Sequence, residues 1–134
     1  MNSWNTCLLI FVGAGVGANA RYWLTIWMGQ RMGPLFPWGT LTVNTLGSLL
    51  IGLLAGAVAG GEPFFQPWRL LLAVGVLGGF TTFSTFSLDA VQLMRDQQWM
   101  LALGYIAAST VVTIAGCGVG FFAARTLSSA PGMS

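Results

Sequence analysis

Four long apolar stretches limit what this chain of 134 residues can fold into. They cover residues 4–29, 40–60, 68–94 and 99–124, and each reaches or exceeds the roughly 20 residues that a membrane-spanning helix needs. Because lipid offers no hydrogen-bond partners, each stretch must satisfy its backbone groups internally as a helix. Only 6% of the residues are charged, against about a quarter in a soluble domain. The sequence therefore predicts an all-α integral membrane protein with four transmembrane helices in a single domain, residues 1–134.

The segments outside the predicted spans are short. The first connection contains Gly33, Pro34 and Pro37, which favour turns. The first apolar stretch is too long for a cleavable signal peptide and lacks its basic start, which predicts a permanent helix. Residues 128–134 are small and polar, and we predict that they form a disordered tail.

The arginines give little indication of which way the chain inserts. With four spans both termini lie on one side of the membrane, and this topology places Arg69 and Arg125 on that side. The opposite side holds Arg31 and Arg95, and also Arg21 if its side chain extends outward. Because a small excess of arginine orients a chain weakly, the sequence predicts insertion in both directions and an antiparallel, dual-topology homodimer. The alternative is that one arginine suffices to orient so small a protein.

Glycines recur at a spacing of four in three of the predicted spans. They are Gly13 and Gly17, then Gly52, Gly56 and Gly60, and finally Gly116 and Gly120. Small residues at this spacing let membrane helices approach closely. The sequence leaves open whether these faces pack inside one chain or between two copies.

Polar side chains also recur four residues apart in two of the predicted spans. They are Thr40, Asn44 and Ser48 in the second span, and Tyr105, Ser109 and Thr113 in the fourth. Polar groups are costly in lipid, so they are candidates for a functional site. The alternative is that they form hydrogen bonds that only hold the helices together. Asn44 fits this alternative least well, because its amide has two donors and an acceptor to satisfy.

The third span contains the motif GGFTTFSTFS at residues 78–87, in which small and hydroxyl residues interrupt an apolar segment. We predict that the helix is broken at Gly78 and Gly79, which would free backbone groups beside the hydroxyl residues that follow, Thr81, Thr82, Ser84 and Thr85. Broken helices in membranes form ion sites, since freed carbonyls bind cations and helix amino termini attract anions.

Two phenylalanines, Phe83 and Phe86, follow the predicted break and share one helix face. The edge of an aromatic ring carries partial positive charge, so a ring presented edge-on is a weak anion ligand. Weak binding suits permeation, because an ion must also leave its site. The alternative is that both rings pack against neighbouring helices.

Several kinds of chemistry have no residues to support them. The chain contains no histidine, and Cys7 and Cys117 lie in apolar stretches, which argues against an enzyme. No carboxylate lies deep in a predicted span, since Asp89 is near the end of the third. This pattern favours passive conduction over proton-coupled transport. A proton-coupled exporter and a structural subunit that only docks a partner remain as alternatives.

Motifs along nearly the whole chain resemble the Fluc (CrcB) fluoride channel family. In order, they are GAGVGANARYW, GTLTVNTLGSLLIG, GGFTTFSTFS and a serine-bearing fourth helix. The resemblance implies a fluoride-selective passive channel that exports fluoride from the cytoplasm and reduces its toxicity, with no enzymatic activity. It further implies a multi-pass, dual-topology homodimer in the inner or plasma membrane, with a structural sodium ion at the dimer interface. Its implied partners are fluoride, sodium, membrane lipid and a second copy, and no nucleic acid.

The resemblance also assigns roles to individual residues of this sequence. It implies that the fluoride pathway is lined by Asn44, Phe83, Phe86, Tyr105, Ser109 and Thr113. We add two neighbouring hydroxyl residues, Thr40 and Ser84, to this predicted pathway. It places Arg21 near an aqueous vestibule, and it implies that the carbonyls of Gly78 and Thr81 hold the sodium ion. Two positions depart from the family pattern: Asp89 stands where the family usually has glutamate, and Thr113 where it typically has serine. The shorter carboxylate of Asp89 puts its partner in doubt.

Overall fold

The computed structural model describes residues 2–59 and 66–128. Within these ranges four apolar helices are long enough to cross a membrane, which confirms the four predicted spans. Three of the four are single α-helices: α1 (Ser3–Met32), α2 (Trp38–Ala59) and α6 (Trp99–Ser128). The fourth, Pro67–Arg95, is divided into α3 (Gln66–Arg69), the π-helical segment η1 (Leu70–Leu77), α4 (Gly78–Phe80) and α5 (Phe83–Arg95). The chain is therefore a multi-pass membrane protein.

The ends of the helices follow from local sequence. Asn2 begins α1 by accepting a hydrogen bond from the Asn5 N–H at 3.0 Å, and Gly33 ends it with a φ of 82° that favours glycine. Helix α6 has 30 residues and is about 45 Å long, so it extends beyond a hydrocarbon core of about 30 Å. Ser128 closes this helix, so the predicted disorder of the tail is wrong for Ser128. Residues 60 and 129–134, which the predicted span and tail include, lie outside the described residues.

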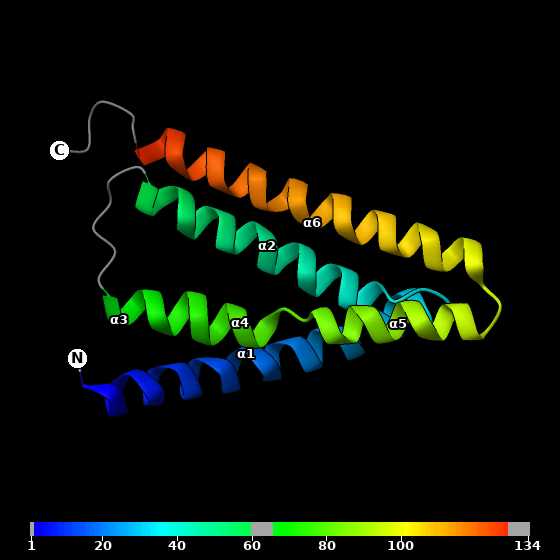
Figure 1. The fold of residues 1–134 in the computed structure, drawn as a ribbon, viewed down its shortest axis with the longest axis horizontal. Coiled ribbons are helices and arrows are strands. Elements are labelled where there is room, and N and C mark those ends of the chain that lie inside the picture. Colours follow the sequence, from blue (N-terminus) through cyan, green and yellow to red (C-terminus); the bar gives the residue numbers. More distant parts are fainter. Residues whose placement is uncertain (1, 60–65, 129–134) are drawn as a thin grey trace.

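Two helix pairs make up the subunit (Figure 1). Helix α2 lies along α6, and α1 lies along η1 and α4. In the first pair, a Cβ on Gly52 would clash with the Cys117 carbonyl, and a Cβ on Gly56 with the Phe121 carbonyl. In the second pair, a Cβ on Gly13 would come within 2.6 Å of the Leu71 carbonyl oxygen. These glycines therefore pack helices inside one chain, which is one of the two possibilities that the sequence left open.

The predicted break at Gly78 and Gly79 is wrong in its position. Gly78 is helical, with φ −64° and ψ −36°, and both glycines belong to α4. The extended residues are Thr81 (φ −78°, ψ 157°) and Thr82 (φ −153°, ψ 120°). Gly79 is instead required for close packing on α1, because a Cβ there would lie 2.5 Å from the Ala14 carbonyl oxygen.

Helix α1 begins and helix α6 ends at the same end of the subunit (Figure 1). The opposite end holds the connection between α1 and α2 and the turn between α5 and α6. Gln97 in this turn has a φ of 60°. Between these two ends, the extended residues after α4 face α2, and seven of the predicted site residues lie around them.

Candidate functional site

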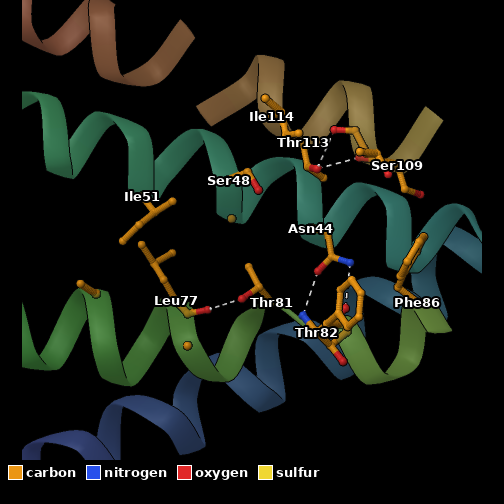
Figure 2. Close-up of a pocket in the computed structure, with 15 residues that line it drawn as sticks. Asn44, Ser48, Ile51, Leu77, Thr81, Thr82, Phe86, Ser109, Thr113 and Ile114 are labelled. Atoms are coloured by element: carbon orange, nitrogen blue, oxygen red, sulfur yellow. Dashed lines mark hydrogen bonds between the residues drawn. The ribbon is translucent and has the colours of Figure 1, made fainter. Parts of the chain in front are cut away.

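A groove with a cavity volume of about 450 Å³ lies among α2, η1, α4, α5 and α6. Figure 2 shows side chains from α2, α6 and the broken third span converging on it. The structure brings together here seven of the predicted site residues: Asn44, Gly78, Thr81, Phe83, Phe86, Ser109 and Thr113. Apolar residues such as Ile51, Leu77 and Ile114 complete its lining. The groove thus combines hydroxyl groups, an amide and aromatic rings in one apolar setting.

The Asn44 side chain holds the extended residues in place. Its Nδ2 donates to the Thr82 carbonyl at 2.9 Å, and its Oδ1 accepts from the Thr82 N–H at 2.8 Å; both bonds are drawn in Figure 2. One amide thus satisfies both backbone groups of a residue that lies outside the helical hydrogen-bond pattern. Each Asn44 amide atom retains capacity for one more hydrogen bond, because the amide has two donors and two acceptor lone pairs.

Thr82 is a groove residue to which the sequence assigned no role of its own beyond its place among the hydroxyl residues after the predicted break. It is 8% exposed and lines the groove. Its Oγ1 accepts from the Thr85 N–H at 3.2 Å, which caps α5, and lies 3.2 Å from Ser84 Oγ. Threonine is a preferred N-cap residue, so a signal for a helix start was present in TTFST. Ser84 is not among the residues that line the groove, although its hydroxyl lies beside that of Thr82, which does line it.

The aromatic rings form a continuous row. Phe83 and Phe86 have ring centroids 5.3 Å apart, and Phe86 lies 5.3 Å from Tyr105. Phe83 is 79% exposed, whereas Tyr105 is fully buried. The row therefore leads from the open surface of the subunit into its interior, and it borders the groove along α5.

Of the three α6 hydroxyls predicted to line the pathway, only one is available as a donor. Thr113 donates to the Ser109 carbonyl of its own helix at 2.6 Å, and Tyr105 donates to the Asp89 carboxylate at 3.2 Å. The Ser109 hydroxyl is buried and has no hydrogen-bond partner among the residues that the structure describes. The Ser109 side chain also lies beside the Tyr105 hydroxyl. Because a hydroxyl carries a single proton, Ser109 can donate either to Tyr105 or to a ligand in the groove.

Arg21 reaches inward to the broken span. Its Nη1 donates to the Thr81 carbonyl at 3.4 Å, and the Thr81 hydroxyl donates to the Leu77 carbonyl at 3.0 Å. The guanidinium therefore does not extend toward the membrane surface. Arg21 is for this reason not counted among the arginines that flank the spans on the side of Arg31 and Arg95. Its long bond to the carbonyl places a positive charge close to the groove.

A second pocket of about 400 Å³ lies at the end of the subunit that holds the connection between α1 and α2. Thr40 lines this second pocket rather than the groove, although it stands one helical turn from Asn44. Asp89 also lines it and accepts the Tyr105 hydrogen bond. The hydrogen-bond partner of Asp89, the shorter carboxylate, is therefore Tyr105.

The described residues contain no cluster of three His, Cys, Asp or Glu side chains that could hold a metal ion. Backbone carbonyls can also bind a cation. Those of Gly78 and Thr81, the two predicted sodium ligands, differ in the hydrogen bonds that they accept. The Thr82 N–H, which would bond the Gly78 carbonyl in a continuing α-helix, bonds Asn44 instead, so the Gly78 carbonyl loses its usual partner. The Thr81 carbonyl already accepts from Arg21.

Comparison with known proteins identifies the family. The family model described as "CrcB-like protein, Camphor Resistance (CrcB)" matches residues 8–121. The chain belongs to the CrcB family. All the residues of this chain that are described as lining the groove lie within the matched region.

Similar proteins come from several bacteria. A protein of Chloroflexus aurantiacus is 42% identical over 120 residues, which cover 87% of this CrcB chain and 95% of the relative. One of Leptospira interrogans is 47% identical over 112 residues, covering 83% and 87%. One of Rhizobium meliloti is 50% identical over 105 residues, covering 78% and 84%. Each of the three relatives is named a fluoride-specific ion channel, FluC.

Proposed function

We propose that this CrcB protein is a fluoride-selective passive ion channel, not an enzyme, and that it exports fluoride from the cytoplasm and reduces fluoride toxicity. The observation that carries the proposal is the groove, which joins a buried unpaired hydroxyl, an amide and two phenylalanine rings. Relatives that match most of the chain are named fluoride-specific channels. The cell membrane, as inner or plasma membrane, is the location in which such export would protect the cytoplasm.

The chemistry of the groove suits a small anion. Among its described lining residues none is charged, so an anion would meet the two phenylalanine rings, the Ser109 hydroxyl and the free capacity of the Asn44 amide. Fluoride is a strong acceptor that such neutral donors can partly desolvate. Binding by dipoles is weak enough to let the ion leave, which conduction requires. The lining also contains no carboxylate, and proton-coupled transport generally uses one.

We further propose that the working unit is an antiparallel homodimer. The groove is open at the surface of one subunit, and Phe83 beside it is 79% exposed. A second copy would cover this surface and turn the groove into an enclosed pathway. With Arg21 bonded inward, each side of the membrane has two arginines: Arg69 and Arg125 on one, and Arg31 and Arg95 on the other. This balance removes the orientation bias that the positive-inside rule would otherwise impose.

A structural sodium ion at the dimer interface completes the proposal. The Gly78 and Thr81 carbonyls of each copy would hold it, since a hard cation prefers oxygen ligands. The released Gly78 carbonyl supports this role. The Thr81 carbonyl accepts one hydrogen bond, from Arg21 at 3.4 Å, and its second lone pair would be available to the ion. The ion would fix the two broken spans against each other and takes no part in fluoride movement.

Fluoride efflux from liposomes tests the function. The purified protein alone is reconstituted with potassium fluoride inside, valinomycin balances the charge, and a fluoride electrode follows release while matched vesicles report chloride. We expect fluoride release without chloride release, and the same rate when the proton gradient is collapsed. Flux that required a proton gradient would favour a coupled exporter. Absence of flux from folded dimers would favour a structural subunit and contradict the proposal.

A further inference from the structure

The Tyr105 side chain lies between residues that line the groove and residues that line the second pocket. Two elements contribute to both cavities: α2 gives Asn44 to the groove and Thr40 to the second pocket. Likewise α5 gives Phe86 to the groove and Asp89 to the second pocket. Between them the Tyr105 side chain is 0% exposed. It touches a lining residue of each cavity, with its ring on Phe86 and its hydroxyl on Asp89.

Tyr105 is held from the side of the second pocket by an aromatic residue of the connection between α1 and α2. The Phe36 ring meets Tyr105 at 5.4 Å between centroids and 90° between planes, an edge-to-face contact. The Trp38 ring packs on the Phe36 ring, with 4.6 Å between their centroids. Edge-to-face pairs fix relative orientation as well as burying area. Phe36 lies outside the groove and lines the second pocket.

We propose that Phe36 is a positioning residue that keeps the Tyr105 ring in the partition between the two cavities and thereby maintains discrimination between ions. The second pocket is then an antechamber at one end of the pathway, and passage to the groove requires the Tyr105 ring to move. This inference rests on the proposed function for its consequence on ion flux. Its structural content, the restraint on Tyr105, stands independently of which ion passes.

Thiol modification tests the restraint without any measurement of transport. Cys7 and Cys117 are replaced by alanine, and Thr40→Cys is introduced as a reporter. Thr40 lines the second pocket yet is only 4% exposed, so a small charged methanethiosulfonate reaches it only when neighbouring side chains move. Adding Phe36→Ala should accelerate modification about fivefold, the effect of losing one aromatic pair. Phe36→Tyr, which keeps the ring, should leave the rate unchanged.

The matched control is Phe122→Ala, which removes another edge-on pair, Phe121 with Phe122 at 5.5 Å and 89°, outside both cavities. It should not alter the reporter rate. If Phe36→Ala does not fold, Phe36→Leu carries the same prediction because it keeps an apolar side chain and removes the ring. An unchanged reporter rate in a folded Phe36 variant overturns the proposal.

A double-mutant cycle decides whether Phe36 acts through Tyr105. In a Tyr105→Leu background, Phe36→Ala should give no further acceleration. Persistent acceleration would mean that Phe36 covers Thr40 directly, and would overturn its role as a positioning residue.

Liposome efflux then tests the consequence for transport. If the wild-type protein conducts fluoride, Phe36→Ala should lower the ratio of fluoride release to chloride release several-fold, whereas Phe122→Ala should leave this ratio unchanged. An unchanged ratio in Phe36→Ala would refute the effect of Phe36 on discrimination between the two ions. A wild-type protein that does not conduct would contradict the proposed function, and the thiol result would still decide the restraint on Tyr105.

Discussion

At the scale of single residues, the structure shows how the hydrogen bonds of the polar side chains are distributed. Residue type and the spacing of four indicated Asn44, Ser109 and Thr113 as candidates, and the structure brings all three to one groove. Which hydroxyl is free to donate could not be predicted, because it depends on side-chain rotamers. Thr113 turns back to its own helix, whereas Ser109 has no partner among the described residues.

Asn44→Ala should destabilise the protein and reduce fluoride efflux together. Removing the amide leaves the N–H and C=O of Thr82 unpaired at a site that is 8% exposed, at a cost of about 1–3 kcal/mol for each group. The melting temperature in detergent and liposome efflux measure the two effects. Asn19→Ala is the matched control, since Asn19 is exposed and donates to the Gly15 carbonyl of its own helix. Equal behaviour of the two variants would contradict the role assigned to Asn44.

Phe83→Ile and Phe86→Ile should each slow fluoride efflux while the protein remains folded. An aliphatic side chain fills similar space but offers no positive ring edge. A loss of about 1 kcal/mol of ion stabilisation at the highest barrier corresponds to about a fivefold lower rate. Efflux per folded protein measures this, with Phe122→Ile as the control because Phe122 lies outside the groove. Unchanged efflux in both variants would rule out the ring-edge account.

At the scale of elements, apolar length and polar spacing predicted the four spans, and the helices occupy them. The position of the break was predicted wrongly, because glycine pairs have two uses that sequence does not distinguish. Gly79 allows α1 to approach closely, and the extended residues follow two positions later. What stabilises them is a side chain from another span, Asn44, and contacts 38 residues apart leave no local signature.

Gly52→Ala should destabilise the α2 and α6 pair. A Cβ there would clash with the Cys117 carbonyl, and backbone cannot yield as a flexible side chain can. We expect a loss on the order of 2 kcal/mol, typical of overpacking. Gly118→Ala on α6 is the control, since a Cβ there would have no neighbouring atom within 4 Å, and alanine in a helix gains up to about 1 kcal/mol over glycine. Thermal unfolding in detergent that ranks Gly52→Ala as the more stable would refute this packing.

At the scale of the whole molecule, the open groove and the balanced arginines lead to the same expectation of a second, inverted copy. Sequence alone suggested this balance but had to leave Arg21 undecided. Because Arg21 bonds inward to Thr81, Arg31 and Arg95 are the two arginines counted on the side of the membrane opposite the termini. Arg31 lies 5.6 Å from the centre of the Trp27 ring, and Arg95 forms an ion pair with Asp96 at 3.0 Å.

Topology reporters fused to the carboxyl terminus should report both orientations. One reporter is active only inside the cell and the other only outside, and we expect comparable signals from both. Adding two lysines to the turn between α5 and α6 should shift the signals strongly toward one orientation, because short-loop charge sets topology. A wild-type protein that gave signal with a single reporter would contradict dual insertion.

The central claim is that the groove conducts fluoride passively and selectively, and the reversal potential of current through planar bilayers tests it most directly. The purified protein is incorporated with a fluoride gradient, equal chloride and equal pH on both sides. We predict a current that reverses at the equilibrium potential of fluoride. A reversal potential near zero, or one that moves with an imposed pH gradient, would contradict a selective passive channel.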